Sequence, residues 1–321
     1  MPAPICLIVN PSAGGGRAAK IAPEFERELR ARGLTVRTVH TRDLDHAREL
    51  AREAAAAGET IAALSGDGLV GVLADVLRDA PGAVLGVLPG GRGNDLARVL
   101  EIPTDPAGAC RVLAEGTPRP LDLGLVEPLH GGPARAFVGI ASVGFDSDAN
   151  RIANEAPPWL GGLVYAYGAL RALISWRPAR FELALDGGEP RRFTGYSVAA
   201  ANSRAYGGGM YAAPDAMLDD GRLDVVVVER VSRLRFLANL PKVFKGTHVR
   251  EPSVHVFRCA EVTISSDRPF EMYADGDPVG TLPVRVSALA GAVTVVAPAS
   301  GAAALSPHAP AAGATPDGAV S

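Results

Sequence analysis

A short apolar run that stops at a glycine-flanked aspartate constrains this chain more than any other feature. Residues 60–64 are almost wholly apolar, and Ser65, Gly66, Asp67 and Gly68 follow directly. Such a run is typical of a buried parallel strand. Glycine lets backbone N–H groups approach a bound group closely, and the helix expected from Val70 onward would direct its N-terminus at an anion. The stretch therefore predicts a phosphate site at the end of a strand.

The surrounding sequence repeats this pattern of strand, loop and helix. Strands are expected at residues 5–9, 35–40, 60–64 and 83–88, with helices at about 21–31, 45–57 and 70–78. This alternation predicts an α/β, doubly wound domain over residues 1–125. Ligands in such sheets bind at the carboxyl ends of the strands, where the loops 10–17, 65–68 and 89–95 are all rich in glycine. We expect these three loops to share one site.

The pattern of apolar and turn residues changes after about residue 125. Short alternating or apolar segments separated by turn residues predict a β-rich, β-sandwich-like domain over residues 126–298. Helices are expected within it near residues 146–154, 163–175 and 233–244. The remaining residues, 299–321, are dominated by Ala, Pro and Gly, and this composition predicts a disordered tail.

Composition excludes several classes of protein. A chain of 321 residues is long enough for two domains, and its net charge of −3 and pI near 6.1 argue against nucleic acid as a partner. The three cysteines and six histidines lack metal-ligand spacing, which favours reduced thiols over a zinc site or a disulfide framework. No signal peptide or apolar run of ~18 residues is present, so we expect a cytoplasmic protein without a transmembrane segment.

Two familiar nucleotide-binding motifs are incomplete or absent in this sequence. Residues 66–71 formally satisfy G-x-G-x-x-G, but the acidic residue that would bind a ribose at the end of the next strand is absent. No stretch reads G-x-x-x-x-G-K-[ST], so a P-loop is excluded. A Rossmann oxidoreductase remains the weakest of the alternatives.

Further motifs follow one another in a fixed order along the chain. Beyond the 65–68 turn they are residues 10–14 (Asn-Pro-Ser-Ala-Gly), 91–98 (Gly-Arg-Gly-Asn-Asp-Leu-Ala-Arg), 206–210 (Tyr-Gly-Gly-Gly-Met), 213–214 (Ala-Pro), 218–224 (Leu-Asp-Asp-Gly-Arg-Leu-Asp) and 275–277 (Asp-Gly-Asp). Together they resemble the diacylglycerol kinase catalytic-domain family, which includes bacterial lipid kinases and sphingosine kinases and is more distantly similar to NAD kinases. The resemblance covers nearly the whole chain.

The resemblance implies a kinase that uses ATP and Mg²⁺ to phosphorylate a lipid hydroxyl. The lipid substrate would be met at a membrane surface, with the enzyme peripheral to its inner face; a homodimer is compatible with the sequence. Phosphoryl transfer needs donors for the phosphates, a cation and an oriented carboxylate. The positions matched to nucleotide binding are Asn10, Thr41, Ser65, Gly66, Asp67, Gly68, Leu69, Gly91, Arg92, Gly93 and Asn94.

The resemblance also assigns catalytic and metal-binding carboxylates. Asp277 matches the general base, usually a Glu in a DGE triplet, although residues 275–277 could also form only a hairpin turn. Asp67 and Asp95 would hold Mg²⁺ directly or through water. Met217, Asp220 and Arg222 match a second, structural Mg²⁺ site, with Asp220 as the side-chain ligand and backbone carbonyls from the other two; the alternative is a solvated Asx turn.

Departures from the family pattern affect the nucleotide loops. Ser65 replaces the first Gly of GGDGT, Leu69 replaces the Thr, and residues 71–72 are Gly-Val where the family has Asn-Glu. Arg92 replaces the Thr of GTGND and adds a guanidinium that can bind phosphate bidentately. One hypothesis is that Arg92 compensates for the hydroxyl lost at Leu69.

Several alternatives remain open from sequence alone. A catalytically silent nucleotide- or lipid-binding homologue and an NAD kinase-like enzyme are the main rivals. The basic, amphipathic stretch 233–250 would either touch an anionic membrane or pack as an ordinary helix with a solvated face. The lipid itself is not specified, and an acyl-chain entrance is one interpretation of a cluster whose alternative is core packing: Trp159, Leu160, Leu163, Val164 and Tyr165.

Overall fold

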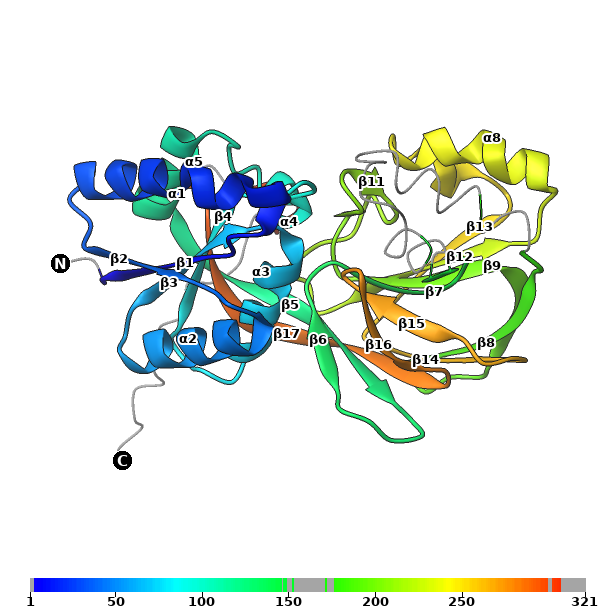
Figure 1. Cartoon of the computed structure of the whole chain (residues 1–321). Coiled ribbons are helices and arrows are strands. Elements are labelled where there is room, and N and C mark those ends of the chain that lie inside the picture. Colours follow the sequence, from blue (N-terminus) through cyan, green and yellow to red (C-terminus); the bar gives the residue numbers. More distant parts are fainter. Residues whose placement is uncertain are drawn as a thin grey trace, which may run out of the picture.

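A computed structural model describes residues 3–145, 147–148, 152, 171, 176–299 and 302–306. Within these residues, strands from both halves of the chain join into one continuous sheet (Figure 1). The two halves differ in how their strands run, and the candidate site lies where they meet.

The first half is a parallel sheet covered by helices on both faces. Its strands lie in the order β2-β1-β3-β4, all parallel. The helices α1 and α5 contact one another, as do α2 and α3, and Figure 1 shows α1 and α2 on opposite faces of the sheet. This confirms the predicted doubly wound unit. Its elements are β1 (Ile5–Val9), α1 (Ala13–Ala31), β2 (Val36–His40), α2 (Leu44–Ala56), β3 (Thr60–Ser65), α3 (Asp67–Leu77), β4 (Val84–Pro89), α4 (Asp95–Val99) and α5 (Pro106–Glu115).

Two sequence patterns explain these elements. Every residue of β1 is buried, as its continuous apolar run predicts for a strand with helices on both faces. In α2, Ala47, Leu50, Ala51 and Ala54 form one buried stripe, and the Asp43 side chain caps the helix by accepting the His46 N–H at 2.8 Å. Helix α3 begins at Asp67, three residues earlier than expected.

The second half is antiparallel and β-rich, as predicted. Apolar residues from its strands form a second core, in which Phe137, Phe181 and Val284 are almost fully buried. Its elements are β6 (Arg135–Phe137), β7 (Ile140–Gly144), β8 (Ala179–Leu185), β9 (Arg191–Ala201), β10 (Ala205–Tyr206), β11 (Met210–Tyr211), β12 (Leu223–Glu229), α8 (Arg233–Val243), the 3₁₀ helix η2 (Thr247–Arg250), β13 (Val254–Cys259), β14 (Glu261–Ser266), β15 (Glu271–Ala274) and β16 (Asp277–Thr281).

Two long antiparallel strands belong to both halves. Strand β5 (Thr117–Pro128) pairs with β17 (Val284–Ala297) along nearly its whole length. The far end of β17 also pairs in parallel with β4, through Thr294 with Val84 and Val295 with Leu85. The chain therefore returns to the first sheet after leaving the second, which the expected boundary at residues 125 and 126 did not indicate.

Part of the expected disordered tail is packed. Ala302, Ala304 and Leu305 are buried at 8%, 0% and 6% exposure, and the Leu218 N–H donates to the Ala304 carbonyl at 2.9 Å. Asp219 accepts bonds from both the backbone N–H and the hydroxyl of Ser306. The prediction is wrong for residues 302–306, because a few apolar side chains with good partners outweigh the Ala/Pro/Gly composition.

Some expectations fall on residues that the structure does not describe. These include the acyl-chain entrance at residues 159–165 and most of the helices expected at 146–154 and 163–175. Among the helices in the described ranges, none is both long and apolar enough to span a bilayer.

Candidate functional site

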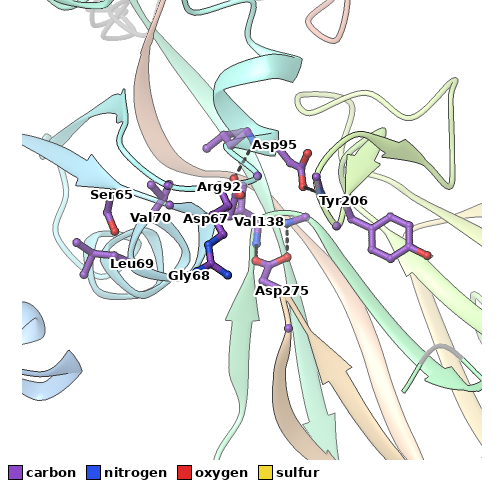
Figure 2. Close-up of a pocket in the computed structure, with 18 of the residues that line it drawn as sticks. Ser65, Asp67, Gly68, Leu69, Val70, Arg92, Asp95, Val138, Tyr206 and Asp275 are labelled. Atoms are coloured by element: carbon purple, nitrogen blue, oxygen red, sulfur yellow. Dashed lines mark hydrogen bonds between the residues drawn. The ribbon is translucent and has the colours of Figure 1, made fainter. Parts of the chain in front are cut away.

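A cavity of about 340 Å³ lies where the three glycine-rich loops meet the second half of the chain (Figure 2). The first half supplies the turn after β3 and the loop after β4, with Asn10 and Gly14 from the loop after β1, which in effect runs on to residue 16 because the first glycines within the bounds of α1 are not helical. The second half supplies residues 138–140 and 205–208, together with Tyr273, Asp275 and Gly276. The three loops thus share one site, as the sequence predicts.

Glycine is required where two of these loops touch. A Cβ on Gly91 would collide with the Gly66 backbone, so the loops after β3 and β4 come this close only because both residues lack side chains. The Asn94 side chain then closes its own loop by accepting the Gly91 N–H at 2.8 Å and donating to the Gly91 carbonyl at 3.1 Å. The loops after β3 and β4 are therefore in direct backbone contact beside the cavity.

Asp67 and Asp95 flank the cavity from neighbouring loops. Both carboxylates approach Gly93: a Cβ there would lie 2.9 Å from Asp67 Oδ2 and 3.4 Å from Asp95 Oδ2. Burial, together with the charge of Asp95, raises the pKa of Asp67. A cation bound here would relieve this repulsion, so the donor set fits Mg²⁺ completed by water or phosphate oxygens.

Asp95 is already held by protein donors. It is buried, its Oδ1 pairs with the Arg98 guanidinium, and its Oδ2 accepts the Gly208 N–H at 2.7 Å. Asp67 Oδ1 accepts the Leu96 N–H at 3.1 Å. Asp67 is thus the better placed of the two to bind a cation directly, with Asp95 joining the two halves of the chain through Gly208.

The expected nucleotide positions divide into two groups. Arg92 is exposed, and its guanidinium lies over the loop after β1, 3.7 Å from where a Cβ on Gly15 would stand. Thr41 and Asn94 are not among the lining residues; Thr41 is buried and its hydroxyl donates to the Val9 carbonyl at 3.4 Å. The remaining expected positions line the cavity: Asn10, Ser65, Gly66, Asp67, Gly68, Leu69, Gly91, Arg92 and Gly93.

Asp275 is the charged side chain of the cavity that sequence reasoning did not include. It projects toward Asp67 in Figure 2 and accepts backbone N–H bonds from Val138 at 2.8 Å, Gly139 at 2.9 Å and Ile140 at 3.1 Å. Burial raises its pKa to about 6, while the three backbone N–H bonds act in the opposite direction and favour the carboxylate. The Asp275 backbone is left-handed, with φ at 49°. In the sequence, the only sign of this conformation is the Asp-Gly pair that opens the 275–277 turn.

Gly139 makes this contact between segments possible. A Cβ at residue 139 would lie 2.5 Å from Asp275 Oδ1, so a side chain at this position would push the carboxylate away from its backbone donors. Asp275 thereby fixes the segment before β7 to the turn between β15 and β16. Asp277, the expected base, is exposed at the start of β16 and is not among the lining residues.

Other lining residues were missed because they come from the second half. Ser142 on β7 and Ser203 after β9 are buried, and Tyr273 lies on β15. Residues 206–208 belong to a glycine-rich motif that the sequence shows, but nothing in the motif indicates which strand ends it will face.

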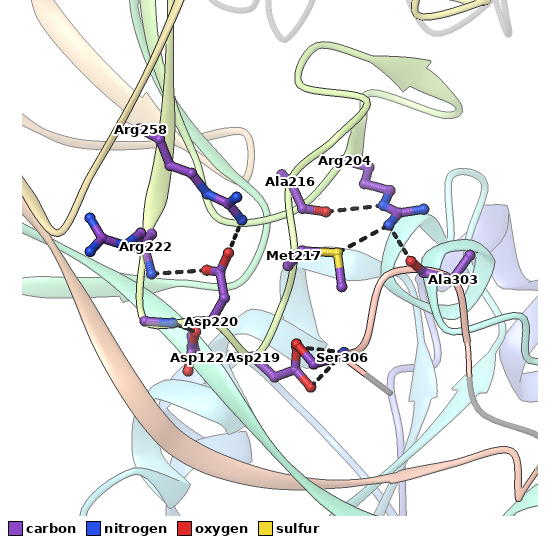
Figure 3. A network of polar contacts seen from close by, with 11 residues as sticks. Asp122, Arg204, Ala216, Met217, Asp219, Asp220, Arg222, Arg258, Ala303 and Ser306 are labelled. Carbon is purple, nitrogen blue, oxygen red and sulfur yellow. Dashed lines mark hydrogen bonds and ion pairs between the residues drawn. The ribbon is translucent and has the colours of Figure 1, made fainter. Parts of the chain in front are cut away.

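The expected second metal site is occupied by protein contacts (Figure 3). Asp220 Oδ1 accepts the Arg222 N–H at 3.0 Å, and Asp220 Oδ2 pairs with the Arg258 guanidinium. The Met217 sulfur lies 3.3 Å from a guanidinium nitrogen of Arg204. Asp220 is the one expected side-chain ligand, and its carboxylate already has a cationic guanidinium as partner, so the site as it stands in this structure does not fit a divalent cation. No cluster of three or more His, Cys, Asp or Glu side chains with metal-site geometry occurs among the described residues.

Comparison with known proteins identifies the family. The sequence model of the diacylglycerol kinase catalytic domain matches residues 4–126, and that of the YegS C-terminal NAD kinase beta sandwich-like domain matches residues 139–297. A diacylglycerol kinase of Mycobacterium tuberculosis (strain ATCC 25618 / H37Rv) is 34% identical over 301 residues, covering 92% of this chain and 96% of its own. The chain belongs to the diacylglycerol kinase catalytic-domain family.

Other relatives agree with this assignment. A protein of Chromohalobacter salexigens named "Probable lipid kinase YegS-like" is 31% identical over 258 residues, covering 78% of this chain and 79% of its own. The crystal structure of a putative diacylglycerol kinase from Bacillus anthracis has a TM-score of 0.77 at 22% identity and covers 92% of this chain and 95% of its own, which shows a shared fold. The predicted family, the predicted two-part fold and the expectation of a kinase are confirmed.

Proposed function

We propose that this kinase transfers the γ-phosphate of ATP to the hydroxyl of diacylglycerol or a closely related lipid alcohol. The observation that carries the proposal is the shared cavity: nine of the expected nucleotide positions, Asp67 among them, line it opposite a turn that holds two further carboxylates. The M. tuberculosis and C. salexigens relatives, named as a diacylglycerol kinase and a probable lipid kinase, support the substrate class.

Each part of the cavity has a role in this proposal. Backbone N–H groups of the strand-end loops and the Arg92 guanidinium bind the phosphates. Asp67 would hold Mg²⁺, which would supply charge neutralisation at the transferring phosphoryl group. The lipid hydroxyl enters from the side of residues 273–277, opposite the nucleotide.

The two carboxylates of the 275–277 turn have different tasks. Asp275 already accepts three N–H bonds, so few of its lone pairs are free to take a proton. We assign it a positioning role: it fixes the turn that presents Asp277. Asp277 is exposed and accepts the proton of the incoming hydroxyl.

A labelling assay tests this function. The purified protein is incubated with γ-labelled ATP, Mg²⁺ and mixed micelles that contain diacylglycerol, a sphingoid base, ceramide or a polyprenol, with Asp67→Asn as the inactive control. Label in the diacylglycerol fraction, lost in the variant, is the expected result. Nucleotide binding without phosphate transfer would identify a catalytically silent homologue, the alternative suggested by the changes at Leu69, Gly71 and Val72. Phosphate transfer to added NAD would identify an NAD kinase.

A further inference from the structure

Helix α8 exposes large apolar side chains to an unusual degree. Six large apolar residues of the described chain are exposed, and three of them lie on α8 or directly after its last residue: Leu234 at 80% exposure, Leu237 at 36% and Phe244 at 56%. Figure 1 shows this helix at the outer edge of the second half. The apolar surface is therefore concentrated on one element instead of scattered.

These side chains form one stripe along the helix. Leu234, Leu237, Pro241 and Phe244 follow at spacings of three and four residues, and Pro241 is also exposed. The opposite side of α8 is anchored: Phe236 is 8% exposed and stacks on Tyr196 with ring centroids 4.3 Å apart. The stripe thus points away from the core. An ordinary core-packed helix would present a polar face there.

The segment around the stripe is strongly basic. Residues 229–251 contain six Lys or Arg and two Glu, a net charge of +4 in a chain whose net charge is −3. Helix α8 itself has no acidic residue, and Glu251 pairs with Arg235 at 3.4 Å and Lys242 at 2.5 Å. Lys245, one turn beyond Pro241, is exposed beside the stripe. The surface is therefore apolar along its centre and cationic around it.

We infer that the α8 surface, made of Leu234, Leu237, Pro241, Phe244 and Lys245, docks this protein onto an anionic lipid bilayer. An apolar stripe with flanking cations is suited to the interface of such a membrane, where the side chains enter the acyl boundary and the cations meet lipid phosphates. A second copy of the chain fits less well, because a twofold contact would oppose two segments of charge +4.

The docking surface is connected to the candidate site. Phe236 of α8 also packs against Phe145, with ring centroids 4.7 Å apart, and Phe145 directly follows β7. Ile140 and Ser142 of the same strand line the cavity. The inference rests on the proposed function only for why the enzyme must reach a membrane; the binding surface itself is argued from exposure and charge.

Cosedimentation with vesicles tests the inference without any kinase assay. The probes are vesicles of phosphatidylcholine mixed equally with phosphatidylglycerol, and vesicles of phosphatidylcholine alone. We expect the wild type to bind the anionic vesicles more tightly, and Leu234→Gln/Leu237→Gln/Phe244→Gln to bind them at least about tenfold more weakly. Lys245→Gln should weaken binding about fivefold and reduce its dependence on salt. The matched control is Leu44→Gln/Leu129→Gln, which removes two side chains that are each 43% exposed elsewhere.

Each outcome separates the inference from the proposed function. The docking surface is overturned if the triple variant binds anionic vesicles with wild-type affinity, or if the control variant loses as much affinity as the triple variant. It is also overturned if light scattering shows that a shift between monomer and dimer accounts for the change in binding. Unchanged melting temperatures establish that the variants fold. Vesicle binding through α8 in a protein that labels no lipid would leave the inference standing and refute the kinase proposal. Labelled lipid from a protein that does not bind vesicles through α8 would refute the inference and leave the kinase proposal standing.

Discussion

Asp275 joins two segments of the candidate site through three backbone N–H bonds, and the proposed function gives it a positioning role. In Asp275→Asn, the amide has one acceptor oxygen for three backbone donors, and its NH₂ group faces an N–H. We expect a loss of about 2–3 kcal/mol in the free energy of unfolding and at least a tenfold fall in kcat. Chemical denaturation and steady-state kinetics measure the two effects.

The neighbouring Asp277 supplies the comparison for that prediction. Asp277→Asn removes an exposed carboxylate and should lower kcat by about 10²–10⁴-fold while the free energy of unfolding stays unchanged. A stable, fully active Asp275→Asn protein would contradict the positioning role. An Asp277→Asn protein with wild-type kcat would contradict its role as base.

Arg92 stands where the family pattern has a Thr, and it adds a guanidinium to the candidate site. Its exposed guanidinium extends over the loop after β1, where nucleotide phosphates are expected. Arg92→Ala should raise KM for ATP about five- to tenfold, and Arg92→Lys should fall between, because it keeps the charge but loses the planar fork. Arg111→Ala, which alters an exposed Arg on α5, is the control. An unchanged KM in Arg92→Ala would remove the idea that Arg92 replaces the missing hydroxyl at Leu69.

His248 makes stability depend on pH. It is 5% exposed, its Nε2 donates to the Ala212 carbonyl at 3.0 Å, and burial lowers its pKa. The folded protein therefore binds this proton less readily than the unfolded chain. The stability from neutral His248 is fully present above the unfolded pKa near 6.5 and is lost as pH falls through that value toward the lower folded pKa.

The variant His248→Gln isolates this contribution, because its amide can still donate to Ala212 but does not titrate. Between pH 7.5 and 5.5, we expect the melting temperature of the wild type to fall more than that of the variant. Thermal unfolding at several pH values gives the comparison. Parallel curves for the two proteins would show that His248 does not titrate on unfolding.

At the scale of elements, the sequence predicted what repeats locally and missed what depends on distant pairing. The buried runs of β1, β3 and β4, and the loops that follow them, were readable because apolar runs and glycine-flanked turns are local patterns. The entry of β17 into the first sheet depends on pairing Thr294 with Val84, two residues 210 positions apart, and no local pattern encodes that choice. Asp275 was missed for the same reason, since its partners lie at residues 138–140.

The loop before β12 shows a guanidinium where a metal was expected. Because Asp220 pairs with Arg258, Mg²⁺ or EDTA should leave the melting temperature of the nucleotide-free wild type unchanged. Arg258→Ala removes a partly exposed ion pair and should cost only about 0–1 kcal/mol, but it frees the Asp220 carboxylate for a cation. Its melting temperature should then rise with Mg²⁺, and Asp220→Asn in the same background should abolish the rise. A Mg²⁺-dependent wild type would restore the metal site.

The whole molecule is tied together by its last described residues. Strands β5 and β17 run through both halves, and residues 302–306 then pack against the first half and the loop of Asp219. Because both halves share these strands, we expect a single cooperative unfolding transition. Leu305→Ala removes a 6% exposed side chain and should cost about 2–4 kcal/mol, lowering the melting temperature of that one transition by roughly 3–6 °C.

Calorimetry can distinguish this coupling from a loosely attached tail. Leu129→Ala, at a residue 43% exposed, is the matched control and should change the melting temperature by no more than about 1 °C. If the tail only covered the first half, Leu305→Ala would split the transition, with the first half melting earlier and the second unchanged. Because β17 passes from one half into the other immediately before this segment, a loss of contacts at Leu305 should instead weaken both halves together.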